Sequence, residues 1–461
     1  MFFQRANKQR ISYNIPMAWY KDKIFWQIAA VAALVKFGLG MYLYFFGPLG
    51  EQTLVFPDSL TYVYPAQTLL AYGHLWEAVS AVPLLMRTPG YPVFLALVQL
   101  VTGNMTWAVA AAQNLLSLLL LLPVYLTTRR LSNPQAARWA AGFCAASVLY
   151  FSLAFAVLTE TLCVFLLAWF VFFAVRWIET PRARDLFAAA ILLAAAVYVR
   201  PVVYYFMPVM IGGLFARAYQ KKSRPLLAQS FCWFALPLLI FIGAWQVRNY
   251  AQTGYGGFTS VGAYNLYIWN EDFVARQSNL TVAQAHQKLL ALLPDDFNTW
   301  PAKEQVKTYK RLAAPLLKQS WKDKLIRWPL WAAKTLLGTN HVHLTRLLLG
   351  RADEPDNTLN QTAALPRPWL SSWAERLLFL CALAQVTAVV LLGGWGIILL
   401  IKTRPAAALF FVIYCGYFWA IGSGFFGAYA RLRAPFEFVL CITAGMAVHT
   451  YLARRKNGCN R

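Results

Sequence analysis

Charge is scarce in this 461-residue sequence, and negative charge is the scarcest: 18 residues are Asp or Glu, against 42 that are Lys or Arg. Charged residues make up 13% of the chain and hydrophobic residues 59%. That balance excludes an ordinary soluble globular protein of this length. Uncharged runs of membrane-spanning length are present, for example residues 105–128 and 226–246. The sequence therefore predicts an integral, multi-pass membrane protein.

Cysteine and histidine are also few, with seven and five residues respectively, and no Cys-x-x-Cys motif or Cys/His cluster is present. Six of the cysteines lie in apolar runs, which is typical of packing side chains rather than of disulfides or metal ligands. No metal and no cofactor are predicted, although Asp58 and Glu160 could share a divalent cation if the fold brought them together. No small-residue cleavage pattern follows the first apolar run, so we expect no removable signal peptide.

The net charge of +24 would suggest nucleic acid as the partner of a soluble protein. In a membrane protein, Lys and Arg instead accumulate in the loops that stay cytoplasmic, so we predict no nucleic-acid partner. Basic clusters at 5–23, 129–138, 176–184, 217–224, 402–404 and 454–456 accordingly mark the inner side.

Together, the apolar runs and basic clusters predict an all-α bundle of about ten spans with both termini inside. The predicted parts are a cytoplasmic tail (1–23), an N-terminal transmembrane module (24–248) with a first outer loop (47–104), an outer-face loop with amphipathic helices (249–370), C-terminal transmembrane helices (371–453) and a cytoplasmic tail (454–461). Residues 90–103 are too short to cross and are expected to form a re-entrant or interfacial helix. Residues 328–350 could be interfacial or spanning, and we favour interfacial.

Several charged residues remain at the outer ends of the predicted spans, where positive charge runs against the inside bias. They are Asp58, Arg87, Glu160, Arg200, Arg248, Arg431 and Arg433. Any single Arg could be an anchor whose side chain extends to the lipid head groups. Five that converge on one face favour an anionic ligand such as phosphate, which fits the planar fork of Arg donors.

The two carboxylates each have a structural alternative. Asp58 precedes a helix-like segment and could simply cap that helix. Glu160 lies in an apolar stretch, where a carboxylate is costly, so it is a functional candidate or the partner of an outer Arg in a structural clamp.

Seven motifs, in order along the chain, resemble one group of enzymes. They are "DSLTYVYPAQTLL", "RTPGYPVFLALV", "LTETL", "YVRPV", "VRNYAQTG", "SVGAYNLYIWN" and "RLRAPFEFVLCITAGMAV". This order is similar to that of the membrane glycosyltransferases of GT-C fold, in the broad group of the protein O-mannosyltransferases and the lipid A aminoarabinose transferases (glycosyltransferase family 39-like). The resemblance covers about residues 24–452.

The resemblance implies an enzyme that transfers a sugar from a polyprenyl-phosphate-linked donor to a lipid, glycan or protein acceptor on the outer face, with inversion. It places Asp58 at the catalytic acidic residue of the first outer loop. Many relatives have a second acid directly after it, where this chain has Ser59. Asp58 would act as the general base, and Arg200, Arg248, Arg431 and Arg433 would stabilise the leaving phosphate.

Further substrate-binding residues are expected to be Tyr62, Arg87, Glu160, Tyr264 and Asn265. The alternative for the polar and aromatic residues of "SVGAYNLYIWN" is a loop or an interfacial aromatic belt. The expected location is a bacterial inner (plasma) membrane, with the active site facing the periplasm or outside. Two other functions remain open: a transporter or flippase of a lipid-linked anion, and a non-catalytic scaffold that binds partners through its outer loop.

Overall fold

A computed structural model describes residues 18–77, 82–103, 105–349, 372–424 and 429–458 of the chain. These residues form helices, and the described part contains no β-strand. The helices of the first half are α1 (Lys23–Phe46), α2 (Pro57–Tyr72), α3 (Gly90–Thr102), α4 (Thr106–Leu119), α5 (Leu121–Leu131), α6 (Pro134–Ala145), α7 (Val148–Leu153), α8 (Glu160–Glu179), α9 (Ala183–Val199), α10 (Phe206–Gln220), α11 (Arg224–Ser230) and α12 (Leu236–Thr253).

The second half continues with α13 (Val261–Ile268), α14 (Glu271–Ser278), α15 (Val282–Leu290), α16 (Ala302–Leu337), α17 (His341–Leu349), α19 (Trp373–Thr403), α20 (Pro405–Ser423) and α21 (Ala434–Gly458). A short 3-10 helix, η6 (Ala430–Arg433), leads into α21. Most of the predicted N-terminal tail (1–17), the end of the predicted outer loop (350–370) and the last three residues lie outside the described part.

Eight helices of the described part are long enough and apolar enough to cross a membrane. They account for eight of the ten expected spans. The other two expected spans, 139–150 and 186–199, coincide with helices of 12 and 17 residues, α6 and α9, which fall short of that length. A bend at 146–147 separates α6 from α7, because the Ser147 side chain caps a new helix by accepting from the Tyr150 N–H. The all-α polytopic architecture is confirmed.

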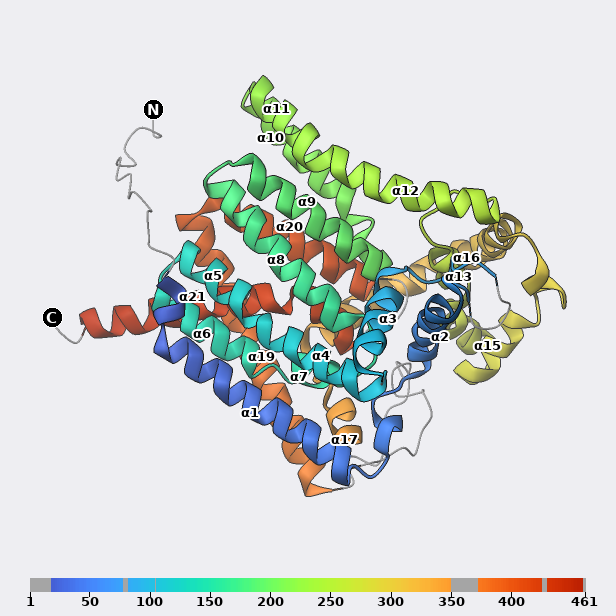
Figure 1. Ribbon diagram of the computed structural model, residues 1–461, viewed down its shortest axis with the longest axis horizontal. Helices are drawn as coiled ribbons and strands as arrows, with labels where there is room; N and C mark the ends of the chain where they lie inside the picture. Colours follow the sequence, from blue (N-terminus) through green and yellow to red (C-terminus); the bar gives the residue numbers. More distant parts are fainter. Residues whose placement is uncertain (1–17, 78–81, 104, 350–371, 425–428, 459–461) are drawn as a thin grey trace.

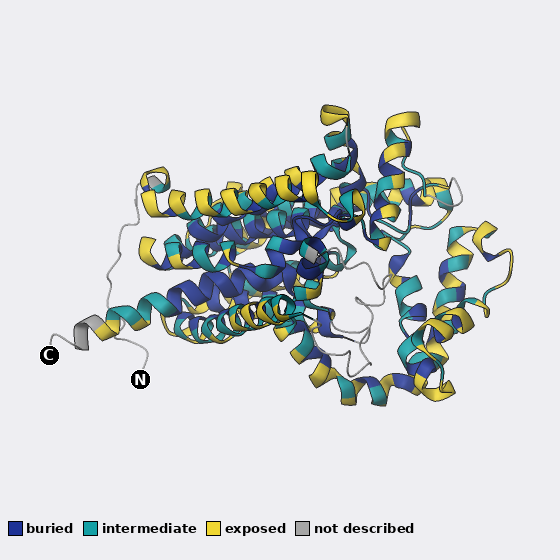
Figure 2. Ribbon diagram, turned by 90° about the horizontal axis from the view of Figure 1, so that it is seen from below, coloured by how far each residue is buried: buried dark blue, intermediate teal, exposed yellow. Residues whose placement is uncertain are grey.

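The centre of the bundle is α21, which packs against α5, α6, α8, α19 and α20. Close approach requires glycine here: a Cβ on Gly396 of α19 would overlap the Thr443 carbonyl of α21. By contrast, α1 lies at the periphery and exposes large apolar side chains such as Leu34 and Phe46. Figure 2 shows this arrangement, with buried residues concentrated inside the bundle. The exposed apolar side chains of α1 are suited to lipid.

The helices α13 to α16 lie at the end of the bundle opposite the two termini (Figure 1). Within this part, buried apolar residues of α13, α14, α15 and α16 form a small core of their own. The two predicted amphipathic stretches are helical, one as α15 and the other inside the 36-residue α16. Residues 328–349 do not form one element, because α16 ends at Leu337 and α17 begins at His341.

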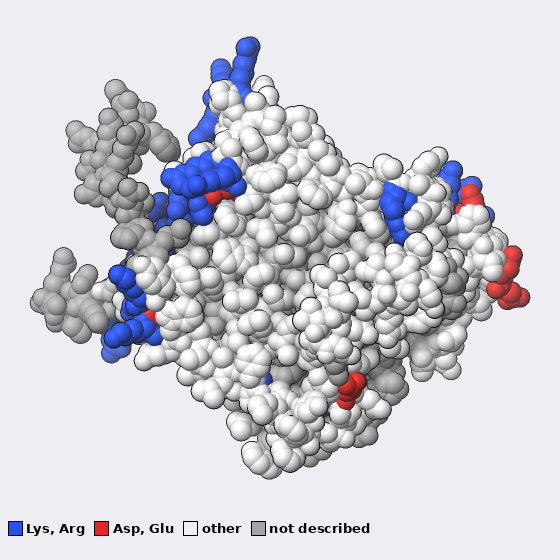
Figure 3. Space-filling view, in the orientation of Figure 1, with Lys and Arg blue, Asp and Glu red and all other residues white. Residues whose placement is uncertain are grey.

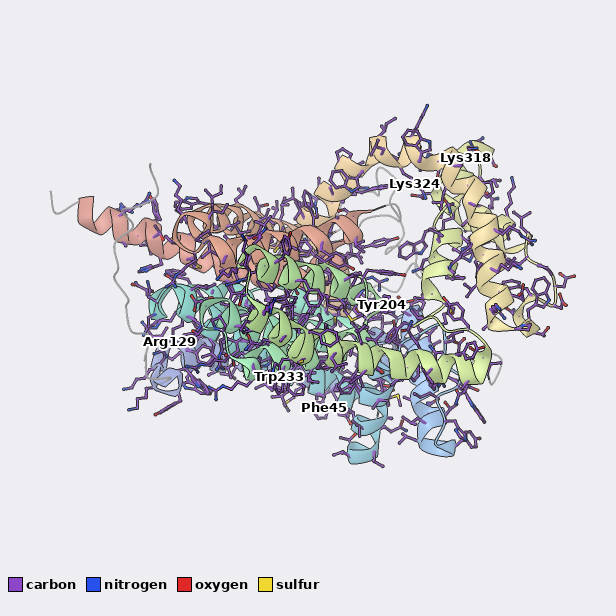
Figure 4. The ribbon with its side chains drawn as sticks, turned by 90° about the horizontal axis from the view of Figure 1, so that it is seen from above. Phe45, Arg129, Tyr204, Trp233, Lys318 and Lys324 are labelled. Carbon is purple, nitrogen blue, oxygen red and sulfur yellow. The ribbon has the colours of Figure 1, made fainter. Side chains whose placement is uncertain are left out.

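Positive charge gathers at the end of the bundle where both termini lie, and the helix surface between the two ends is almost uncharged in Figure 3. Arg129 lies at that end, whereas Lys318 and Lys324 of α16 lie at the other (Figure 4). The basic loops and α13–α16 therefore lie at opposite ends of the bundle.

Candidate active site

The site begins at the first turn of α2, where the chain leaves α1. Pro57 occupies the first helical position, and Ser59 closes the turn by accepting a hydrogen bond from the Phe56 N–H at 2.8 Å. The Ser59 hydroxyl also donates to the Val157 carbonyl at 2.8 Å. Ser59, at the position where the resemblance implies a second acid, is thus a fully buried member of the capping box of α2. Asp58 itself is not the cap, so that alternative is wrong.

The Asp58 carboxylate instead lies between two arginines. Arg87 Nη2 donates to one oxygen at 2.8 Å, and Arg431 Nη1 and Nη2 lie 3.3 and 3.2 Å from the other. Arg87 is fixed in turn by a bond of 3.0 Å from its Nε to the Thr61 hydroxyl. The Asp58 side chain keeps 37% of its exposure, so it remains accessible from outside the protein.

The second carboxylate, Glu160, is buried at the start of α8. Its Oε1 lies 2.7 Å from Arg200 Nη1 and 4.0 Å from Arg431 Nη1. Arg431 therefore connects the two acids, and the charges alternate along Arg87, Asp58, Arg431, Glu160 and Arg200. We call these five residues the charge chain. They come from five segments that are up to 373 residues apart in sequence.

Short backbone contacts hold these segments in register. The Val157 N–H donates to the Leu54 carbonyl at 2.9 Å, which ties the start of α2 to the start of α8. The Thr88 hydroxyl donates to the Val199 carbonyl at 3.0 Å. At Gly90 the chain passes so close to α9 that an added Cβ would lie 2.7 Å from the Tyr198 carbonyl oxygen. These contacts hold the segment that carries Arg87 against the end of α9, which carries Arg200, without using the charged groups themselves.

The charge chain has three arginines and two acids, which leaves one positive charge in excess. In addition, Arg431 Nε is buried and has no hydrogen-bond partner among the described residues. A buried donor without a partner costs about 1–3 kcal/mol. Both features favour the binding of a singly charged anion between Arg87 and Arg431, and Arg forks are well matched to phosphate oxygens.

Aromatic residues line the same region. The Tyr62 ring lies beneath Arg87, with 4.9 Å between the guanidinium carbon and the ring centre. Burial and then Glu271 raise the pKa of Tyr264, on which Arg87 and Asp58 also act, so its hydroxyl stays protonated near the charge chain. Asn265 follows Tyr264 on α13 and is half-buried. Tyr429 and Arg346 also belong to this region, and neither was among the residues predicted from the sequence.

Tyr429 precedes Arg431 by two residues, and burial raises its pKa, so it too is a hydroxyl donor. Its position beside a motif Arg was the one signal that could have revealed it. Arg346 lies over the Phe56 ring at 4.8 Å and donates to the Gln52 and Val55 carbonyls. It thereby holds the segment before Asp58, a role that no sequence pattern indicates.

Two of the predicted phosphate-binding arginines do not join the charge chain. Arg433 is 1% exposed; its Nε donates to Glu437 at 2.6 Å, and its Nη1 donates to the carbonyls of Thr335, Leu336 and Gly338. It is a structural clamp on the end of α16. Arg248 donates to the Leu84 carbonyl at 2.7 Å and lies over the Trp245 ring. The prediction that all five arginines converge was therefore wrong for Arg248 and Arg433, because each donates to neighbouring backbone carbonyls away from the charge chain.

The described residues contain no group of three or more His, Cys, Asp or Glu side chains arranged to hold a metal ion. Asp58 and Glu160 do approach one another, but Arg431 lies between them. A divalent cation that bridged the two carboxylates would have to displace this guanidinium. The donor set as it stands thus fits an anion better than a cation.

The stability of the Asp58 ion pairs should not vary near neutral pH. Burial raises the pKa of Asp58, but Arg431 and Arg87 lower it by more, so the pKa lies below its usual value of 3.8. A depressed pKa makes a stabilising contribution that is fully present above the unfolded value and is lost as pH falls through the folded value. We expect the difference in thermal midpoint between wild type and Asp58→Asn to be constant from about pH 5 to 8 and to shrink below about pH 4. A difference that changed around neutral pH would contradict this assignment.

The helical architecture and its membrane-length helices define the class: the fold is that of the GT-C membrane glycosyltransferases. Residues 86–245, about a third of the chain, match the family model described as dolichyl-phosphate-mannose-protein mannosyltransferase. The resemblance predicted from the ordered motifs is thereby confirmed. A search of curated protein sequences gives no match.

Solved structures support the same fold. The archaeal oligosaccharyltransferase AglB from Archaeoglobus fulgidus, in complex with an inhibitory peptide and a dolichol-phosphate, is 14% identical with a TM-score of 0.52, over 96% of this chain and 52% of that one. The same oligosaccharyltransferase in complex with Zn and sulfate is 12% identical with a TM-score of 0.54, over 94% and 49%. ArnT from Cupriavidus metallidurans bound to undecaprenyl phosphate is 16% identical over 92% and 77%, but its TM-score of 0.40 supports no argument. This chain spans about half the length of AglB.

Proposed function

We propose that this protein is a glycosyltransferase that transfers a sugar from a polyprenyl-phosphate-linked donor to a hydroxyl group of an acceptor at the outer face of a membrane. The observation that carries the proposal is the placement of an accessible carboxylate, Asp58, directly between two phosphate-suited arginines, Arg87 and Arg431. The matching family model and the AglB complex with dolichol-phosphate support a lipid-phosphate donor.

The proposed reaction assigns the charge chain two tasks. Asp58 accepts the proton of the acceptor hydroxyl, and at the same time the oxygen of that hydroxyl forms a bond to the anomeric carbon of the sugar. The bond between that carbon and the phosphate oxygen breaks, and the electron pair leaves with the polyprenyl phosphate. Arg87 and Arg431 stabilise the charge that grows on the phosphate, and attack from the opposite face inverts the anomeric centre.

Binding of the polyprenyl-phosphate donor would also make Asp58 a stronger base. In the free site, both arginines bind the Asp58 carboxylate and so reduce its affinity for a proton. A phosphodiester that draws Arg87 or Arg431 away from Asp58 would restore that affinity. The sugar would then lie between the phosphate and the hydroxyls of Tyr264 and Tyr429, with Asn265 as a further hydrogen-bonding group. Glu160, itself paired with Arg200, attracts Arg431 from its other side.

The described residues give less support to the alternative function, a transporter of a lipid-linked anion. A transporter of a lipid-linked anion needs a polar path near the middle of the membrane. The charge chain instead lies where α2, α8 and α21 begin and where α9 ends. The cavity next to Glu160 inside the bundle holds only about 10 Å³.

Retention of the donor lipid tests the phosphate assignment. We expect the purified wild-type protein to bind undecaprenyl phosphate, and Arg431→Ala to bind it about tenfold or more weakly, because a charged hydrogen bond is worth about 1.5–3 kcal/mol. Native mass spectrometry with added undecaprenyl phosphate measures this. The control is Arg311→Ala, an exposed arginine on α16 whose loss changes the net charge equally. Equal retention by Arg431→Ala and Arg311→Ala would refute the assignment.

A further inference from the structure

We propose a second binding site, at the far end of α2 from Asp58, in which Arg248 holds the anionic head group of a membrane lipid. This inference goes beyond the transfer reaction and does not depend on it. It starts from a cavity of about 450 Å³ that is lined by Leu69, Gly73, His74, Leu75, Trp76, Pro83, Arg248 and Gln252. Fifteen residues of helix separate Asp58 from Gly73, or about 22 Å, so the cavity is distinct from the charge chain.

Arg248 provides a cation whose fork is only partly used. Its Nη1 donates to the Leu84 carbonyl at 2.7 Å and to the Asn249 side chain at 3.1 Å. No described residue accepts from its Nε or Nη2. The guanidinium rests on the Trp245 ring at 4.5 Å, which fixes its plane. The free edge of an oriented guanidinium is a ready pair of donors for a phosphate or carboxylate.

The walls of the cavity combine apolar and ring surfaces. Leu69, Leu75 and Pro83 are apolar, and Trp76 stacks with His74 at 5.4 Å and with Tyr72 at 5.8 Å. A β-bridge pairs Trp76 with Pro83, and the Trp76 N–H donates to the Thr68 hydroxyl of α2 at 3.2 Å. Such walls suit an amphipathic ligand, whereas a fully hydrated inorganic anion gains nothing from them.

The position of the cavity identifies the bilayer as the source of the ligand. Arg248 and Gln252 lie one turn apart near the end of the candidate span 224–253. Along this helix the side chains of Leu239, Ile240 and Phe241 are exposed, and the exposed fractions of Val247 and Tyr250 are 69% and 67%. A lipid whose chains cover that apolar stripe would bring its head group to the level of Arg248, where Trp and Tyr are typical of the membrane interface.

The site is also joined to the charge chain through the loop before Arg87. Arg248 holds the Leu84 carbonyl, Glu77 accepts from the Leu85 and Met86 N–H groups, and the Thr259 hydroxyl donates to the Met86 carbonyl. Arg87 is the next residue. A lipid bound at Arg248 would therefore stabilise the loop that presents Arg87 to Asp58.

Lipid titration of the full-length protein, read by native mass spectrometry, tests the site. The probes are phosphatidylglycerol and phosphatidylcholine with the same acyl chains. We expect wild type to bind one phosphatidylglycerol that phosphatidylcholine does not replace, and Arg248→Ala to bind it about tenfold or more weakly. Gln252→Trp alters an exposed residue of the lining and should weaken binding with Arg248 intact. Arg311→Ala, the charge-matched control, should bind as wild type does.

Three results would overturn the proposal: unchanged binding in Arg248→Ala, equal binding of phosphatidylcholine, or full displacement by inorganic phosphate. Competition by undecaprenyl phosphate tells the two lipid sources apart, since a bulk phospholipid site should not prefer it. Because Arg431→Ala is expected to keep the phosphatidylglycerol and lose the polyprenyl phosphate, failure of this site and failure of the proposed function give different outcomes.

Discussion

Asp58→Asn is expected to lower the rate of sugar transfer by roughly 10²–10⁴-fold, the usual contribution of a general base. The amide is nearly isosteric, but its single oxygen can accept from only one of Arg87 and Arg431, and it cannot take the proton of the acceptor hydroxyl. The donor should therefore still bind while turnover is lost. The measurement is single-turnover transfer from the polyprenyl-phosphate sugar, with donor retention followed in parallel by native mass spectrometry.

The control for this experiment is Glu51→Gln, which neutralises an exposed carboxylate of the same outer loop that takes no part in the charge chain. It should transfer at the wild-type rate. The thermal midpoint of Asp58→Asn should be only slightly lower than that of wild type, by the same amount from about pH 5 to 8, since the carboxylate is partly exposed and does not cap α2. Transfer by Asp58→Asn at the wild-type rate would remove Asp58 from the proposed chemistry.

Arg433→Ala is expected to have the largest effect on stability, a loss of about 3–5 kcal/mol in the free energy of unfolding. The substitution leaves the buried Glu437 carboxylate without its ion-pair partner, although Ser147 still donates to it. It also leaves the carbonyls of Thr335, Leu336 and Gly338 without this donor. The loss should be visible as a lower thermal midpoint of the purified protein in detergent.

A double variant distinguishes a structural from a substrate-binding role for Arg433. Glu437→Leu in the Arg433→Leu background removes the isolated charge, and it should restore part of the stability that Arg433→Leu loses. A substrate-binding arginine would behave differently: Arg433→Ala would keep its thermal midpoint and lose undecaprenyl phosphate. That pattern would reinstate the interpretation that the sequence alone suggested.

Much of the architecture could be read from composition. Long uncharged runs can be satisfied in a bilayer only as helices, so the spans at 23–46 and 373–403 were predictable from length and hydropathy. The short helix α3 was predictable for the same reason, since 13 residues cannot cross. The boundaries around α6, α7 and α8 were not, because Ser147 and Glu160 are isolated polar residues in a largely apolar stretch, and the helix breaks there depend on caps.

The candidate site divides along the same line. The sequence by itself determined which reactive side chains are available, namely a few acids and several arginines at the predicted outer ends of spans. Burial of charge there is costly, so such residues are candidates for function. Only the tertiary structure decided which of these side chains form ion pairs with one another. Asp58 meets Arg431 across 373 residues, whereas Arg433, two residues further on, turns to Glu437 and the end of α16. Two arginines so close in sequence point to different sides of the short helix η6, and which side faces the site depends on packing that no local pattern records.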